Sequence, residues 1–158
     1  MTHVAFTGHR GLPDDVVPLV DGALRQVLAQ YDGELVGITS LADGADTLFA
    51  RAVLDAGGRL RAVIPATHYR EALPAEHRPV LDDLLAHATD VVHLDHPDST
   101  SESHMAAAQR MLDDADELIA VWDGKPARGY GGTADIVAEA RRRHIPVQVV
   151  WPEGARRD

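Results

Sequence analysis

The sequence predicts a single α/β domain, in which a doubly wound, mainly parallel sheet of about six strands carries helices on both faces. Short apolar, β-branched runs alternate along the whole chain with amphipathic stretches of helical period. Each run is apolar at its centre, which is typical of strands buried on both faces. The 158 residues suffice for one sizeable core but are too few for two ordinary domains.

The expected strands are bounded by polar and turn residues. They are HVAFTG at 3–8, ELVGITS at 34–40, RLRAVIP at 59–65, DVVHLD at 90–95, ELIAVWDG at 117–124 and PVQVVWP at 146–152. Trp122 and Trp151 fall within two of these runs, so we expect both to be core residues. Strands separated by helical stretches are typical of βαβ units, and the sheet should therefore be parallel.

Five stretches have the apolar spacing of helices: 14–31, 45–56, 78–88, 102–115 and 133–144. Ser101 and Glu102 are interpreted first as the N-cap and first-turn acid of the fourth helix. Residues 66–79 contain two prolines and should form a surface loop or a short helix. The tail 153–158 is expected to fray, which leaves 1–152 as the domain.

Composition and charge argue against several classes of protein. The formal net charge is −10 and the basic residues are scattered, which disfavours general nucleic-acid binding. The chain has no cysteine and no HExxH motif, so neither a disulfide framework nor a metal site is expected, and no cofactor is predicted. No apolar run approaches the roughly 20 residues that span a bilayer. We therefore expect a cytoplasmic protein without a membrane partner.

Two loops that follow strands offer ligand-binding groups at the sheet edge where parallel α/β proteins bind ligands. The first, TGHRG at 7–11, contains Thr7, Gly8, His9 and Arg10, and an arginine here could hold a phosphate. The second, TSLADGADT at 39–47, contains Thr39, Ser40, Asp43 and Gly44, small or polar residues that let a ligand approach the backbone. Asp43 or Asp46 could instead cap the following helix.

The third loop lies in WDGKPARGYGGTADIVAEA, residues 122–140. Its glycines at 129, 131 and 132 permit positive φ and leave successive N–H groups bare, as in an anion site at a helix N-terminus. Thr133 could cap the helix or bind a phosphate oxygen, and Lys125 and Arg128 add positive charge. The expected ligand contacts are Asp123, Arg128, Gly129, Tyr130, Gly131, Gly132 and Thr133. Tyr69 and Tyr130, both expected in loops, are candidates to stack on a base.

With these loops the chain resembles the SLOG superfamily, a Rossmann-like group that includes the DprA/SMF core, the LONELY GUY (LOG) phosphoribohydrolases and YpsA-like proteins. The stretch ITSLADGADTLFARAVLDAGGRLRAVIP at 38–65 is similar to the DprA core. TGHR at 7–10 and ADELIAVWDGKPARGYGGTADIVAEA at 115–140 are more similar to YpsA-like proteins. The resemblance covers nearly the whole chain. It implies a three-layer Rossmann-like fold and a nucleotide or nucleotide-derived ligand over the Gly-rich loops, and it is compatible with a homodimer.

Three functions are open at this point. The first is a nucleotide-binding or sensing module without turnover, and the alternative is a LOG-like phosphoribohydrolase, an N-glycosidase that cleaves nucleoside monophosphates. Its oxocarbenium-like transition state needs a carboxylate near the ribose, for which Asp135, Asp46 and Glu102 are candidates. LOG enzymes carry PGGxGTxxE, whereas here GYGGT at 129–133 matches only the glycines and Ile136 follows three residues after Thr133. In the third function, a non-enzymatic assembly protein, the loops only close the fold.

Overall fold

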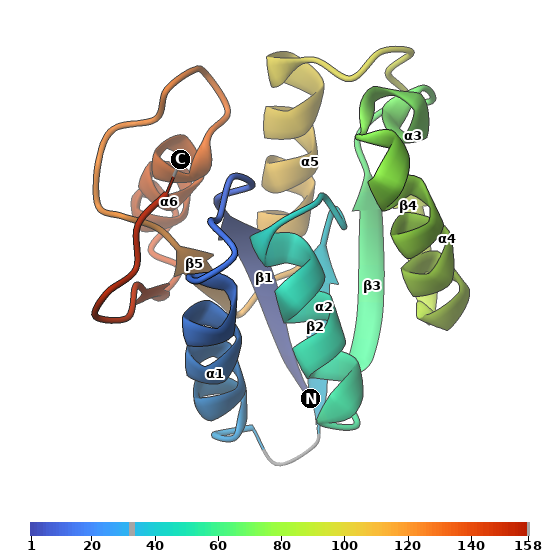
Figure 1. Cartoon of the computed structure of the whole chain (residues 1–158). Coiled ribbons are helices and arrows are strands. Elements are labelled where there is room, and N and C mark those ends of the chain that lie inside the picture. The colour runs from blue at the N-terminus through green and yellow to red at the C-terminus, as the bar shows by residue number, and fades with distance from the viewer. Residues whose placement is uncertain (32–33, 158) are drawn as a thin grey trace.

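The structure, a computed structural model, describes residues 1–31 and 34–157, which form a six-stranded parallel sheet with helices on both faces (Figure 1). The strands are β1 Thr2–Gly8, β2 Leu35–Thr39, β3 Arg59–Ile64, β4 Asp90–His93, β5 Glu117–Val121 and β6 Val147–Val150. Each overlaps its predicted run, and the predicted three-layer, Rossmann-like fold class is confirmed. Asp158 of the predicted tail lies outside the described residues.

The strand order is β4-β3-β2-β1-β5-β6, so the direction of winding reverses beside β1. From β1 the chain adds β2, β3 and β4 on one side, then crosses back to place β5 on the other side. β1 pairs in parallel with β2, where Ala5 aligns with Ile38, and with β5, where Thr7 aligns with Ala120. The carboxyl ends of β1 and β5 therefore border the switch point, where open α/β sheets bind ligands.

The helices divide between the two faces of the sheet. They are α1 Val17–Leu28, α2 Ala45–Asp55, α3 Tyr69–Ala72, α4 Arg78–His87, α5 Ser101–Asp113 and α6 Thr133–Arg142, with a 3₁₀ turn η1 at Ala75–His77. Side chains alternate along β1, so Val4 and Phe6 pack with α1 and α2 while Ala5 packs with α5 and α6. The short α3 and α4 join the α1 and α2 face through their contacts with β3 and α2.

Segment 66–79, predicted to be a surface loop or short helix, contains α3 and η1 and contributes to the core. Tyr69, predicted to lie in a loop, is the first residue of α3 and only 3% exposed. His77 is also buried, and its Nε2 donates to the carbonyl of Leu41 at 2.9 Å. Leu41 has a φ of 60°, so this bond holds the β2–α2 loop in a left-handed turn.

Two helix starts differ from the predicted caps. Thr100, rather than Ser101, is the N-cap of α5, because its hydroxyl accepts from the Ser103 N–H at 3.1 Å. Glu102 lies in the first turn of α5, as predicted. Gly44 is the N-cap of α2 and neither Asp43 nor Asp46 caps that helix.

Residues 153–157 of the expected tail contact the domain, and the expectation that the tail frays stays a prediction. The Arg156 guanidinium donates to both carboxylate oxygens of Asp15, at 2.7 and 2.8 Å. Ala155 packs against the core cluster that α1 and α2 form with β1. These contacts hold the segment against the loop between β1 and α1.

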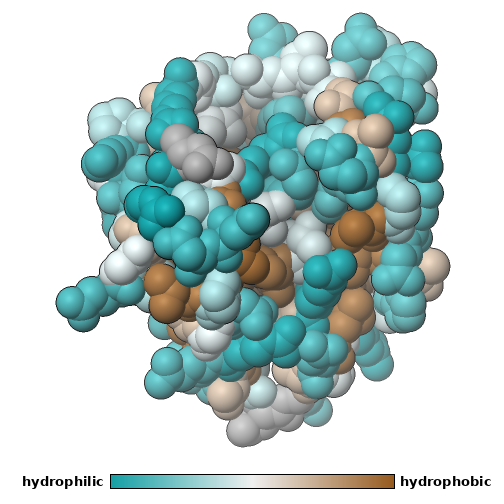
Figure 2. Space-filling view, in the orientation of Figure 1, coloured by the Kyte–Doolittle hydropathy of each residue, from teal (hydrophilic) through white to brown (hydrophobic). Residues whose placement is uncertain are grey.

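The face seen in Figure 2 is largely hydrophilic, with apolar groups in small patches between polar ones. The large apolar side chains exposed among the described residues are Met1, Leu19, Tyr130 and Val149. In the described part of the chain, no helix combines the length and apolar character needed to cross a membrane. The homodimer stays a prediction.

Gly37 in β2 provides a test of the contact between the sheet and α2. A Cβ at this position would lie 2.7 Å from Val53 Cγ2 and 3.0 Å from Phe49 Cε2. We expect Gly37→Ala to lower the free energy of unfolding by about 1–3 kcal/mol, measured by urea denaturation. The matched control is Gly22→Ala on the exposed face of α1, where nothing lies within 4 Å. The Gly22 variant should be more stable than the parent by up to about 1 kcal/mol. Equal stability of the Gly37 variant and the parent would contradict this packing.

Candidate functional site

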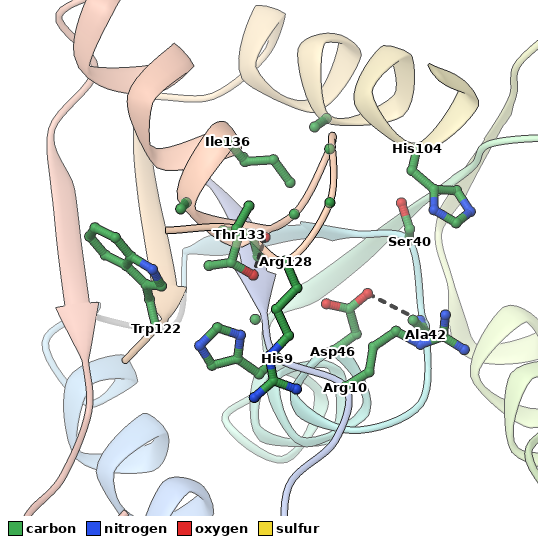
Figure 3. A pocket seen from close by; sticks show the side chains of 18 of the residues that line it. His9, Arg10, Ser40, Ala42, Asp46, His104, Trp122, Arg128, Thr133 and Ile136 are labelled. Carbon is green, nitrogen blue, oxygen red and sulfur yellow. Dashed lines mark hydrogen bonds between the residues drawn. The ribbon is translucent and has the colours of Figure 1, made fainter. Parts of the chain in front are cut away.

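A cleft of about 480 Å³ opens at the carboxyl ends of β1 and β5 (Figure 3). Its walls come from the three loops singled out in the sequence, from α5 and from the segment 153–157. Most of the predicted ligand-binding residues line it: Thr7, Gly8, His9, Arg10, Ser40, Arg128, Gly129, Tyr130, Gly131, Gly132 and Thr133. The structure thus brings together residues 126 positions apart, as shown by the 3.3 Å hydrogen bond between the Thr7 and Thr133 hydroxyls.

Four predicted ligand-binding residues do not line the cleft but shape its loops. The Thr39 hydroxyl accepts from the Leu41 N–H at 3.2 Å, and the Gly44 carbonyl accepts from Thr47 and Leu48 at the start of α2. Asp43 accepts from the Arg10 guanidinium at 2.6 and 3.0 Å. Asp123 accepts from the Lys125 N–H at 3.0 Å. These residues position the groups that face the cleft.

His9 joins the loops that form the cleft. Its N–H donates to the Val121 carbonyl and its carbonyl accepts from the Ala45 N–H, both at 3.2 Å. Its ring is 4% exposed, and Nε2 accepts from the Asp123 N–H at 3.0 Å. Burial lowers the pKa of His9, and the charge of Arg157 lowers it further. A ring that accepts at Nε2 is neutral and carries its proton on Nδ1.

The Gly-rich loop uses its three glycines differently from the prediction. Only Gly131 has a positive φ, 85°, and a Cβ there would lie 2.9 Å from the Ser101 carbonyl oxygen. Gly132 has a φ of −74°, and its N–H donates to the Gly129 carbonyl at 3.3 Å. The prediction of positive φ at positions 129 and 132 is therefore wrong, and one glycine meets the steric demand of the turn.

Two backbone amides at the start of α6 remain available to a ligand. The Gly131 N–H is occupied, because it donates to Asp135 Oδ2 at 2.9 Å. Thr133 does not cap α6, since its hydroxyl contacts Thr7. The N–H groups of Thr133 and Ala134 find no acceptor among residues 1–31 and 34–157. Such first-turn donors, with the helix dipole behind them, favour an anion.

Positive charge gathers around the cleft although the chain as a whole is acidic. Four cationic side chains line it: Arg10, Lys125, Arg128 and Arg157. Arg10 is paired with Asp43, whereas Lys125 and Arg128 form no ion pair with the residues that the structure describes. In Figure 3 the Arg128 side chain extends from the Gly-rich loop toward His9. The site is therefore cationic at the end bordered by β5 and α6.

Of the three predicted catalytic acids, only Asp46 lines the cleft. Its Oδ2 accepts from the Ala42 N–H at 3.1 Å, and burial raises the pKa of its carboxyl to about 7. Asp135 is committed to the Gly131 N–H, and Glu102 is exposed on α5. The structure thus places Asp135 in a supporting position within the loop and Glu102 outside the cleft.

An apolar wall faces the cationic end, and the sequence reasoning missed most of it. It contains Pro65, Tyr69, Ala108, Met111 and Ile136, together with the polar His104, while Trp122 lies at the cationic end beside Lys125. His104, Ala108 and Met111 have the i, i+4, i+7 spacing of one helix face, and this spacing could have revealed them. Burial lowers the pKa of His104, whose Nε2 lies 2.6 Å from the Ser99 hydroxyl.

The prediction that Trp122 lies in a strand is wrong, although its side chain packs partly buried against the core, as predicted. β5 ends at Val121, and Trp122 is partly exposed and lines the cleft. Its indole N–H donates to the Lys125 carbonyl at 2.8 Å, and the Arg141 guanidinium lies over the ring, 5.8 Å from its centroid. Trp151 follows β6 and packs partly buried against the core, edge-on to His9.

Asp46→Asn should change how stability depends on pH. The pKa of Asp46 is about 7 in the folded chain and its ordinary value is 3.8, so the folded state retains this proton longer and stability falls between about pH 4 and pH 7. Asparagine cannot ionise, so the variant lacks this loss of stability. The difference in free energy of unfolding, variant minus parent, should therefore rise by roughly 1–4 kcal/mol over this pH range and then level off. Urea denaturation at several pH values measures it. A difference independent of pH would contradict the burial of this carboxyl.

Comparison with known proteins shows similarity in fold rather than in sequence. No protein-family model matches the chain, and no curated protein matches it in sequence. DNA processing protein A from Streptococcus pneumoniae superposes with a TM-score of 0.67 at 19% identity; the match covers 94% of this chain and 50% of that protein. DNA processing protein A from Helicobacter pylori, described for its single-stranded DNA binding, gives 0.69 at 15% identity over 99% and 68% of the two chains.

A third similar structure is the molybdenum cofactor binding protein from Rippkaea orientalis, with a TM-score of 0.61 at 15% identity over 94% of this chain and 75% of that one. This chain thus spans half the length of the Streptococcus protein and about two thirds of the Helicobacter one. The resemblance to the DprA core is confirmed at the level of the fold. The chain has the Rossmann-like fold that DNA processing protein A and a molybdenum cofactor binding protein also have.

Proposed function

We propose that the chain binds a nucleotide or nucleotide-derived, phosphoribosyl-containing ligand in this cleft, as a binding or sensing module. One observation carries the proposal. An apolar wall and a cationic end lined by backbone amides lie in the same cleft, at the switch point of the sheet. A nucleotide has the same two characters, a flat apolar base and an anionic phosphate. The volume of about 480 Å³ lies within the range of small-molecule sites.

The phosphate end is assigned to the start of α6. The free N–H groups of Thr133 and Ala134 point from the first turn of a helix, and Arg128 lines the same part of the cleft. Helix N-termini bind phosphate through such amides, and a guanidinium adds charge-assisted hydrogen bonds. Arg128 is exposed and has no ion-pair partner among the described residues, so it is available for this contact.

The base is assigned to the apolar wall of α5 and the Gly-rich loop. Met111, Ala108 and Ile136 offer apolar contacts, and Tyr130, 61% exposed at the rim, can stack on a ring. Ser40 and His104 supply hydrogen-bonding groups that could select among bases. Tyr69, which also lines the cleft, packs edge-on against His104, with ring centroids 6.0 Å apart.

A small nucleotide fits the charge pattern better than a nucleic acid does. The net charge is −10, and four cationic side chains gather in the cleft although the chain as a whole is acidic. Single-stranded DNA binding is known for the similar Helicobacter protein, and we therefore include an oligonucleotide as a competing ligand in the test below.

A thermal-shift panel tests the binding proposal. It contains AMP and other nucleoside monophosphates, ADP-ribose, NAD and a short single-stranded oligonucleotide, with inorganic phosphate as the control. A ligand at 100 times its dissociation constant should add about 2.7 kcal/mol of stability. Arg128→Gln should weaken nucleotide binding roughly 10- to 100-fold without changing the stability of the free protein.

Arg51→Gln removes the same charge from the exposed side of α2, outside the cleft, and should bind like the parent. The proposal fails if no nucleotide exceeds the phosphate control, or if the Arg128 variant binds as well as the parent. A response to the oligonucleotide alone would favour nucleic-acid binding.

One observation favours the alternative, a phosphoribohydrolase that cleaves nucleoside monophosphates. Asp46 lines the cleft with a pKa raised by burial to about 7, so its carboxyl retains a proton near neutral pH. A carboxyl of this kind can donate a proton to a departing base as a general acid. Glu102 is exposed outside the cleft and Asp135 is held by the Gly-rich loop, so Asp46 is the acid that we assign to this reaction.

Release of free base from AMP, followed by chromatography, tests the alternative. If the chain has this activity, Asp46→Asn should reduce the rate by about 100-fold or more while AMP still binds. Glu102→Gln is the matched control and should leave the rate unchanged. Activity that survives in Asp46→Asn would remove this assignment, and absence of any release would leave the binding module as the function.

A further inference from the structure

The last described residues return to the cleft. In Figure 1 the dark red end of the chain, marked C, lies beside α6 in this view. Arg156 holds Asp15 through two hydrogen bonds, and Ala155 packs on the core. The residue that follows, Arg157, lines the cleft. We call residues 153–157 the strap.

Arg157 lies in the cleft with one ion-pair partner, at the limit of contact distance. Its side chain is 20% exposed, and its nearest acid is Asp123, with 4.0 Å between Arg157 Nη1 and Asp123 Oδ2. Asp123 shares its charge between two partners, because its Oδ2 faces Arg157 while its Oδ1 accepts from the Lys125 N–H. The Nε–H of Arg157 is buried and has no hydrogen-bond partner among the described residues. A buried guanidinium donor without an acceptor is unfavourable, so Arg157 has hydrogen-bonding capacity that the fold leaves unused.

A second arginine lies at the same end of the cleft. Arg128 also lines it, and the charges of both Arg157 and Arg128 act on the buried His9 ring and lower its pKa. The two arginines come from different segments; Arg128 forms no ion pair among the described residues, and Arg157 has the single distant ion pair with Asp123. Two guanidinium groups around one space match a phosphate with two negative charges better than a neutral or singly charged group.

We propose that Arg157 is a phosphate-binding residue, supplied by the strap, and that a terminal phosphomonoester is held between Arg157 and Arg128. The inference rests on the proposed function and names its ligand class more closely. The ligand is a nucleotide with a terminal phosphate. A nucleoside lacks the dianion, and a phosphodiester carries one charge fewer, so both bind more weakly.

Calorimetric titration of AMP and of adenosine into the parent, Arg157→Gln, Arg157→Lys and Arg51→Gln tests the inference. Arg157→Gln should weaken AMP roughly 10- to 100-fold and leave adenosine unchanged, because only the phosphate contact is lost. Arg157→Lys should retain part of the affinity, since it keeps the charge but loses the planar fork. Arg51→Gln should match the parent for both ligands.

The outcomes separate the inference from the proposed function. AMP bound equally by Arg157→Gln and the parent would overturn the role of Arg157 while leaving the binding function intact. Equal losses for AMP and adenosine would also overturn it, because they would show that Arg157 only supports the fold. A parent that binds neither ligand would refute the proposed function, and the inference with it.

Discussion

The cleft depends on one residue, His9, whose backbone and ring connect the three strand-following loops. β1 and β5 are neighbours in the sheet, and the bonds from His9 to Val121, Ala45 and Asp123 join the loops that follow them to the start of α2. The ring is buried and neutral, so it can accept the Asp123 N–H, which a protonated ring could not do. Through this junction, the start of α2, the end of β5 and the Gly-rich loop keep fixed positions around a common space.

The topology explains why this space has two chemical characters. α6 begins at the switch point with two free N–H groups, and the loop before it brings Arg128 and Lys125. α5 reaches the opposite side after crossing the sheet and contributes small and apolar side chains. The acidic surface of the chain and its cationic cleft are compatible, because the acids near the site are paired with arginines or with backbone N–H groups.

The sequence predicted the fold and the loops well, because both follow from local signals: apolar runs specify buried strands, and clustered glycines mark loops that approach ligands. The failures involve contacts between distant segments. No local signal in the sequence shows that Asp135 accepts from the Gly131 N–H instead of facing a ligand. Likewise, the residues around Arg157 do not indicate that Arg156 contacts Asp15. Trp122 was misplaced because apolar composition continues past the residue where β5 stops pairing. Tyr69 was expected in a loop because Pro74 follows it, although its ring completes the core beside α4.

The most direct test of a phosphate site at the start of α6 is a ¹⁵N–¹H correlation titration with AMP and with adenosine. The account predicts that AMP shifts the amide signals of Thr133 and Ala134, and that adenosine leaves these two signals in place. Both ligands should shift signals along α5 near Ala108. Signals of Thr133 and Ala134 that do not respond to AMP, or responses confined to the shallow groove between α1 and β6, would contradict the account.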